Sequence, residues 1–140
     1  MPSMNARLQT AEHVLFRILI DRYGAKPRSV RYEQDKCLLD VVAEKDLRKI
    51  DPKEFEDAAN EIISRNLEVK KYFLPRKEAE KVVDLSLVPE NINKIRIVEI
   101  IGFDKEACAG NHVDNTREIG RMKIMNVEKK EKILIEFTLF

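Results

Sequence analysis

The chain has no tryptophan, and only two cysteines, two histidines and four glycines occur among its 140 residues. Long apolar runs are also missing. No stretch approaches the ~18 residues of a membrane-spanning helix, so we expect no membrane partner. The first residues, MPSMNARLQT, lack the apolar stretch and the small-residue cleavage site of a signal peptide. We therefore expect a cytoplasmic protein in which Cys37 and Cys108 are thiols and not a disulfide.

Charge of one sign is not in excess either. The 26 basic and 25 acidic residues leave a formal net charge of +1. A nucleic acid would therefore have to be bound by a local basic patch and not by the whole surface. Such groups of basic residues are more often solvated faces than binding sites. The candidates are Arg22, Lys26, Arg28 and Arg31, and the cluster Lys70, Lys71, Arg76 and Lys77.

What the chain does have is the composition of a globular protein. Apolar residues make up 44% of it and charged residues 36%. Because single domains most often run to about 100–150 residues, we expect one domain over residues 1–140. No internal repeat, low-complexity stretch or linker divides the sequence.

Periodicity and turn residues predict an α+β fold, an antiparallel sheet with helices packed on it. Asp51 is a candidate N-cap, Pro52 takes the first helical position, and Glu54 completes a capping box. The polar segment 104–120 is predicted to be a loop, and the tail a hairpin in which Ile133, Ile135, Phe137 and Leu139 point one way. Helices are expected at 7–23, 51–66 and 76–83, and strands at 29–33, 36–43, 69–73, 94–101 and within the hairpin 122–140.

The first helix has apolar residues on two sides. At about 100° per residue, Ala11, Val14, Leu15 and Ile18 form one stripe. The other side carries Gln9, His13, Phe16 and Ile20, where a surface helix usually has a polar back. That second side could wall a pocket that accepts small side chains. The alternative is a helix enclosed in the core, with His13 hydrogen-bonded.

The motif CAGNH places Cys108 and His112 four residues apart in the predicted loop. A thiolate and an imidazole are ligands that zinc prefers, and Gly110 lets the turn close so that both face one point. Taken alone, Cys108 could equally be a buried small hydrophobe. With His13 on the unusual helix face, three ligands and an open position would resemble a catalytic zinc site.

These residues also carry a family resemblance. CAGNHVDNTREIG resembles the C-x-G-x-H-v-x-N-T-g-E-I-G segment of the editing domain of alanyl-tRNA synthetase and of its free-standing relatives, the AlaX trans-editing proteins. QTAEHVL resembles the H-x-x-x-H helix of the same family, and YFLPRKEAEKV and the closing hairpin follow the family's order. The resemblance covers essentially the whole chain.

The resemblance implies both an activity and a site. The activity is hydrolysis of tRNA(Ala) misacylated with serine or glycine, in trans because no aminoacylation domain is expected. The partner is then tRNA and not DNA, and the cofactor is zinc. The family's second helix histidine falls on His13, its cysteine on Cys108 and its last histidine on His112.

Two positions depart from the family pattern. Gln9 stands where the family has its first histidine, and an amide oxygen is a poor zinc ligand beside an imidazole. Zinc could then be weak, lacking, or held by three side chains and a water. Arg117 stands where the family usually has glycine. It could contact an RNA phosphate or extend into solvent, and we favour solvent.

The chemistry needs no strong nucleophile, because an aminoacyl ester is already activated. Zinc could lower the pKa of a bound water toward ~7 or orient the substrate. Without zinc, Gln9 and His13 could still position a water by hydrogen bonds. Ser29 is a candidate hydroxyl for recognising serine. Two other functions stay open: an inactive RNA-binding or regulatory module, and a zinc hydrolase of another acyl substrate.

Overall fold

The computed structural model describes residues 2–129 and 133–140, and its central element is helix α1 (Met4–Tyr23). Ser3 caps the helix, since its hydroxyl accepts a hydrogen bond from the backbone N–H of Ala6 (3.1 Å). Gly24, with φ 65°, ends it in the left-handed conformation typical of a helix C-terminus. The helix thus starts earlier than the predicted residue 7, because sequence periodicity does not reveal the cap at Ser3.

A four-stranded antiparallel sheet lies against α1. Its order is β1-β2-β7-β6. The strands are β1 (Lys26–Glu33), β2 (Lys36–Val42), β6 (Met122–Lys129) and β7 (Ile133–Leu139). The predicted turn at Gln34 and Asp35 joins β1 to β2, with Gln34 at φ 47°. The hairpin of β6 and β7 is confirmed, although the predicted residues 130–132 between these strands lie outside the described residues.

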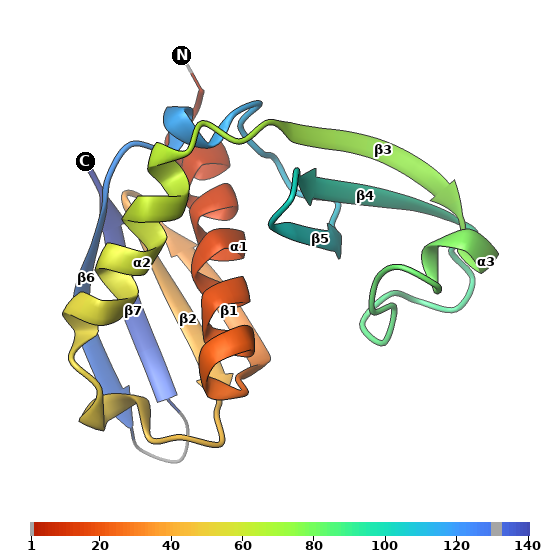
Figure 1. Ribbon diagram of the computed structural model, residues 1–140. Helices are drawn as coiled ribbons and strands as arrows, with labels where there is room; N and C mark the ends of the chain where they lie inside the picture. The colour runs from red at the N-terminus through yellow and green to blue at the C-terminus, as the bar shows by residue number, and fades with distance from the viewer. Residues whose placement is uncertain (1, 130–132) are drawn as a thin grey trace.

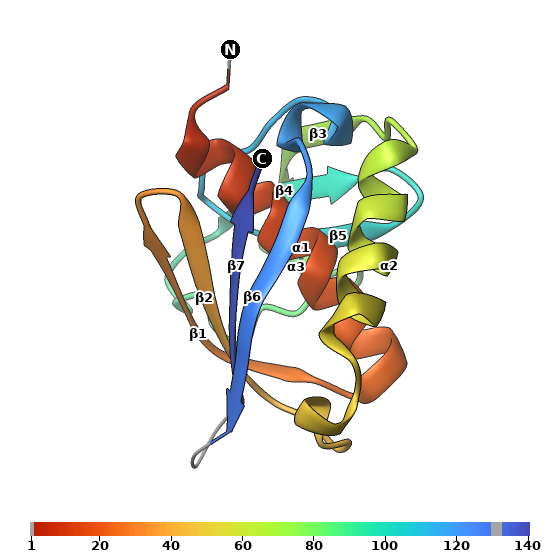
Figure 2. The same cartoon turned by 90° about the vertical axis from the view of Figure 1, so that its left-hand side faces the viewer.

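Helix α2 (Pro52–Ser64) lies beside α1 on the same face of this sheet. Figure 1 shows the two helices side by side with the strands behind them, and in Figure 2 α2 stands to the right of β6. The predicted N-cap is confirmed, because the Asp51 carboxylate accepts from the N–H of Lys53 (3.0 Å). Phe55 and Ala59 are fully buried, whereas Ala58 is only half-buried. A short 3-10 turn, η1 (Leu47–Lys49), precedes α2.

A second antiparallel sheet extends away from α1 on the other side (Figure 1). Its order is β3-β4-β5, formed by β3 (Val69–Pro75), β4 (Lys94–Ile100) and β5 (Asp104–Ala107). The α+β class is confirmed, but with two sheets where one was expected. The prediction of a loop over 104–120 was wrong at its start, because residues 104–107 pair with β4. The predicted helix 76–83 is a single turn, α3 (Arg76–Ala79).

The position of α1 between the two sheets accounts for its two buried sides. Ala11 and Val14 are fully buried, and on the opposite side His13 is 6% exposed and Phe16 5% exposed. Helix α1 contacts the strands of the first sheet and also β5 of the second. The expected apolar face and the unusual second face are therefore both interior surfaces. Across residues 2–129 and 133–140, no helix has the length and apolar character required to span a bilayer.

The segment between β5 and β6 is fastened to the end of α2. The fully buried Thr116 accepts the N–H of Leu67 (2.8 Å) and donates to the carbonyl of Ile63 (3.1 Å). Asn115 caps the following 3-10 turn, η2 (Thr116–Ile119), by accepting the N–H of Arg117 (2.9 Å). The N-T pair of the sequence motif therefore holds the loop in place.

Gly120, at the end of this segment, lies close to the backbone of Phe140. Its φ is 90° and its ψ −142°, a region open essentially to glycine alone, and a Cβ would lie 2.3 Å from the carbonyl oxygen of Phe140. We expect Gly120→Ala to lower the free energy of unfolding by about 3 kcal/mol or more in urea titrations. Gly102→Ala is the matched control, since Gly102 has φ 77° and nothing within 4 Å. It should cost about 1–2 kcal/mol. Equal costs would show that the contact with Phe140 is unimportant.

Candidate metal centre

Three potential metal ligands converge where α1 meets the loop after β5. One ligand atom from each of His13, Cys108 and His112 lies within 4.8 Å of the other two. Cys108 Sγ is 3.3 Å from His112 Nε2, and the two imidazole rings have centroids 4.5 Å apart. His13 is far from Cys108 and His112 in the sequence, and the packing of the loop on α1 brings the three residues together.

The hydroxyl of Thr10 orients His112. It donates to the carbonyl of Ala6 (3.0 Å), accepts the N–H of Val113 (3.1 Å) and lies 3.0 Å from His112 Nδ1. A hydroxyl has one hydrogen, and that hydrogen is already directed at Ala6. With that hydrogen directed at Ala6, His112 Nδ1 is assigned as the donor to Thr10. The lone pair of His112 is therefore on Nε2, which faces Cys108.

Carboxylates orient His13. Its Nδ1 lies 2.7 Å from Glu106 Oε2 and 3.5 Å from Asp104 Oδ2. Asp104 is buried and also accepts a hydrogen bond from Arg17 Nε (2.8 Å). A carboxylate at one imidazole nitrogen is the usual arrangement around a metal-ligating histidine, and it raises the basicity of the ring. Nε2 of His13 is the nitrogen left to face the cluster.

The electrostatics of the site favour a cation. Burial alone would lower the pKa of His13, but its contacts with Asp104, Cys108 and Glu106 raise that pKa well above its ordinary value. Burial raises the pKa of Glu12 to about 7, and Glu12 Oε2 lies 3.8 Å from His13 Nε2. A buried site with three carboxyl groups around one imidazole attracts positive charge.

The same environment keeps the second histidine neutral. Burial, helped by the positive charge of His13, lowers the pKa of His112 to about 3. A neutral imidazole is the form that binds metals. With one sulfur and two imidazole nitrogens, the donor set matches zinc, and both rings have a second partner that fixes their orientation. His13, Cys108 and His112 therefore fit a zinc ion once His13 releases its proton, as a histidine ligand does when it binds metal.

Gln9 lies against the loop that carries Cys108 and His112. A Cβ on Gly110 would lie 1.8 Å from Gln9 Oε1, so residue 110 has no room for a side chain while Gln9 keeps this position. The backbone of Gly110 does not have a positive φ. Its role is thus close approach rather than a special turn. Gln9 Nε2 donates to Asn5 Oδ1 (2.6 Å).

Ser29 is not brought to this cluster. It is exposed on the edge strand β1, where its hydroxyl donates to Asp40 Oδ2 (3.4 Å). Ser29 pairs with Asp40 across the strands, and the neighbouring residues Leu39 and Val41 face the core. Because side chains alternate along a strand, Ser29 and Asp40 face the side of the sheet away from α1.

Several residues that shape the site were missed by the sequence analysis. Asp104 and Glu106 lie in the segment assigned to a loop, and Thr10 was not considered. The alternation of Asp104, Glu106 and Cys108 at every second position is the one signal that pointed to a shared strand face. Thr10 left no signal, since threonine inside a helix is ordinary.

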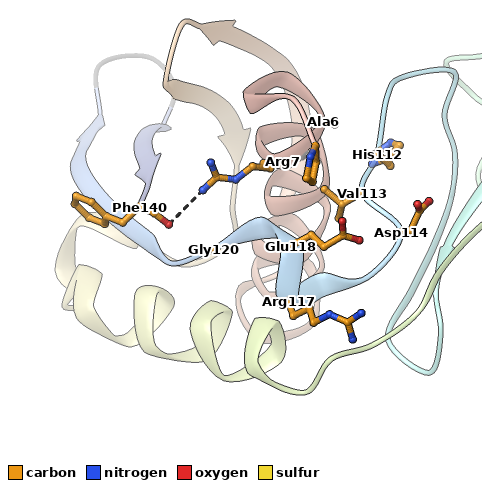
Figure 3. A pocket seen from close by; sticks show the side chains of 10 residues that line it. Ala6, Arg7, His112, Val113, Asp114, Arg117, Glu118, Gly120 and Phe140 are labelled. Carbon is orange, nitrogen blue, oxygen red and sulfur yellow. Dashed lines mark hydrogen bonds between the residues drawn. The ribbon is translucent and has the colours of Figure 1, made fainter.

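Two cavities flank the cluster. One, of about 890 Å³, is lined by His112, Arg7 and Arg117 (Figure 3). Arg7 donates to the carbonyls of Ile119 (2.9 Å) and Phe140 (3.2 Å), while the side chain of Arg117 is exposed.

The other cavity, of about 200 Å³, is lined by Phe16, Ile20 and Glu106. The expectation that Phe16 and Ile20 wall a pocket is thus confirmed. Asp84 and Lys105 also line it, so the pocket is partly polar.

Comparison with known proteins shows which family this fold and this cluster resemble. The family described as threonyl and alanyl tRNA synthetase second additional domain matches residues 95–135, which include Cys108 and His112. Residues 95–135 are therefore similar to part of this domain family. The resemblance inferred from the motifs is confirmed.

Relatives extend the similarity to α1 and both sheets. The chain is 36% identical over 130 residues to the alanyl-tRNA editing protein AlaX-M of Saccharolobus solfataricus, covering 90% of this chain and 54% of that protein. It is 36% identical over 132 residues to AlaX-M of Methanosarcina mazei, 90% of this chain and 52% of that protein. It is 42% identical over 98 residues to the alanine--tRNA ligase of Staphylothermus marinus, 68% of this chain and 11% of that protein. The chain thus spans about half the length of its AlaX-M relatives.

The hydrogen bonds of Thr10 predict how it affects metal binding. Thr10→Val keeps the shape of the side chain but removes the oxygen that His112 and Val113 share. We expect zinc affinity, measured by competition with a chromophoric chelator, to fall about 10–100-fold. Thr10→Ser keeps the oxygen and should keep most of the affinity. Similar dissociation constants for the two variants would mean that Thr10 does not orient His112.

Proposed function

We propose that this chain is an aminoacyl-tRNA deacylase that acts in trans on tRNA(Ala) carrying serine or glycine. The observation that carries the proposal is the convergence of His13, Cys108 and His112, in a chain homologous along most of its length to alanyl-tRNA editing proteins. The ligand set supports zinc as the cofactor, held by these three residues. The partner would be tRNA, and the site of action the cytoplasm, where translation takes place.

The residues of the chain would prepare a water for attack on the ester. His13, Cys108 and His112 would hold the zinc ion, which would supply Lewis-acid chemistry for the ester. Glu106 and Asp104 hold His13 through Nδ1, and Thr10 holds His112 in the tautomer with Nε2 free. Without zinc, Gln9 and His13 would direct a water by hydrogen bonds. Water adds to the carbonyl, the ester C–O bond breaks, and the ribose oxygen takes a proton.

The cavity beside Glu106 would hold the amino acid. Its volume of about 200 Å³ suits a small side chain. Glu106, one of its two acidic lining residues, would face the substrate's ammonium group, and the polar lining offers partners for a serine hydroxyl. Ser29 lies on the far face of its sheet, so the role first assigned to it rests on sequence alignment alone.

The substrate prediction follows from the lone hydroxyl that distinguishes serine from alanine. A site that hydrogen-bonds a hydroxyl can reject the analogue lacking it by up to about 10⁴–10⁵-fold, because its own polar groups are left unpaired. We expect Ser-tRNA(Ala) to be hydrolysed and Ala-tRNA(Ala) to be largely spared. His13→Ala and Cys108→Ala should each lower the rate on Ser-tRNA(Ala) by at least about 100-fold.

Deacylation of both esters should be measured side by side, with a panel of other aminoacyl-tRNAs and with Met125→Ala as an exposed surface control. Equal rates on the two esters, or full activity in either site variant, contradict the assignment. Hydrolysis of another acyl-tRNA alone would point to a different acyl substrate. RNA binding without any hydrolysis would point to a binding module.

Gln9→His tests the departure from the family pattern. The replacement adds an imidazole one turn before His13, while glutamine and histidine differ little in helix propensity. We expect zinc to bind more tightly, with the thermal midpoint of the zinc-free protein little changed. Gln9→Leu serves as the control that removes the amide without adding a ligand. Unchanged zinc affinity in Gln9→His would show that residue 9 does not reach the metal.

A further inference from the structure

Arg17 lies one turn after His13 on α1 and contacts two carboxylates. Its Nε donates to Asp104 Oδ1 (2.8 Å), whereas its Nη1 is 3.4 Å from Asp21 Oδ1. The Asp104 side chain is 1% exposed and the Asp21 side chain is 61% exposed. Because an exposed ion pair contributes little, the partner that fixes the side chain of Arg17 is Asp104.

Two carboxylates lie beside one N–H of His13. The Nδ1 atom is 2.7 Å from Glu106 Oε2 and 3.5 Å from Asp104 Oδ2. A ring nitrogen carries at most one hydrogen, and the shorter distance assigns it to Glu106. At 3.5 Å the oxygen of Asp104 is too far away to compete. The orientation of the His13 ring therefore depends on Asp104 staying further away than Glu106.

Arg17 holds Asp104 at that distance. Within residues 2–129 and 133–140, the bond from Arg17 is the only hydrogen bond that the Asp104 side chain accepts. A buried carboxylate is tolerated only when it has a partner of opposite charge or a donor. If Arg17 is removed, a donor already close to Asp104 is His13 Nδ1. Asp104 would then move toward the ring and compete with Glu106 for its hydrogen.

A second cation near this contact does not replace Arg17. Arg17 and Lys105 both line the cavity beside Glu106 and a neighbouring cavity of about 370 Å³. The ammonium of Lys105 lies 3.9 Å from Glu99 Oε1, on the far side of β5 from His13's partner Glu106 in the alternation of the strand. The charge of Asp104 is therefore balanced by Arg17 and not by Lys105.

We infer that Arg17 is a positioning residue for the metal centre. By holding Asp104, it leaves the Nδ1 hydrogen of His13 to Glu106, and this fixes the ring with Nε2 directed at the metal. Arg17 acts through Asp104 and is not itself a ligand. The inference rests on the proposed function, since that function makes His13 a zinc ligand.

A double-mutant cycle separates this role from a general effect on stability. Arg17→Met should weaken zinc binding, measured by competition with a chromophoric chelator, about 10–100-fold, as is usual when the partner behind a metal ligand is lost. In an Asp104→Asn background the same change should weaken zinc binding by less than about 3-fold, because the residue through which Arg17 acts is already altered. Arg17→Lys should keep most of the affinity, since only one N–H of Arg17 bonds to Asp104. If circular dichroism shows that Arg17→Met does not fold, Arg17→Gln takes its place in the cycle.

Asp21→Asn is the matched control, because it removes only the exposed partner of Arg17. It should leave zinc affinity unchanged. The d–d absorption bands of the Co²⁺-substituted protein, which report ligand geometry, should shift in Arg17→Met and not in Asp21→Asn. The inference is wrong if Arg17→Met binds zinc like the wild type, if its loss is as large in the Asp104→Asn background, or if the wild type binds no zinc.

Deacylation of Ser-tRNA(Ala) by the wild type is measured separately and tests the proposed function. A wild type that binds zinc and follows the cycle but hydrolyses no aminoacyl-tRNA would contradict the function and support the role of Arg17. Hydrolysis by the wild type with no effect of Arg17→Met on zinc affinity would contradict the role of Arg17 alone.

Discussion

The hydroxyl of Thr10 is the contact on which the site depends, because it joins two segments that lie 102 residues apart. It accepts the N–H of Val113 and contacts His112, while its own hydrogen is directed at the carbonyl of Ala6. Thr10 is fully buried, so water cannot replace these bonds if the oxygen is lost. The place of the loop on α1, and with it the distance between His13 and His112, is set by one polar atom inside a helix.

The loop is irregular in shape but anchored at both ends. Arg96 holds the carbonyls of Cys108 and Gly110 at its beginning, and Thr116 bonds to the chain after α2 at its end. Loops that carry function on rigid scaffolds commonly owe their precision to such anchors. Here the anchors come from three different elements, α1, α2 and β4. The geometry of the cluster therefore depends on how these elements pack together and is not a local property of the CAGNH sequence.

Sequence periodicity predicted the helices and strands that bury one regular face. It failed for a segment that becomes a strand only because it pairs with a neighbouring strand. The stripe of Ala11 and Val14 and the capping of α2 by Asp51 are local patterns, and both are confirmed. Residues 104–107 are polar, and only pairing with β4 makes them a strand. Because this pairing could not be predicted from the sequence, the position of Glu106 beside His13 could not be predicted either. A charged residue is buried only when its partner is close, and sequence does not reveal a partner from a distant segment.

The convergence of Cys108 and His112 was open to prediction because four residues of loop keep them together, whereas the place of Gln9 was not. Its amide nitrogen is taken by Asn5, and its oxygen lies against Gly110, a position that needs the loop in its folded place. Glutamine therefore closes the gap between α1 and the loop without supplying a strong fourth ligand. Three ligands with an open position are characteristic of a catalytic zinc site, whereas a structural zinc takes four. A weaker ligand at residue 9 would thus leave a position open for a substrate at the proposed zinc, and the carboxylates around His13 supply negative charge that favours a cation there.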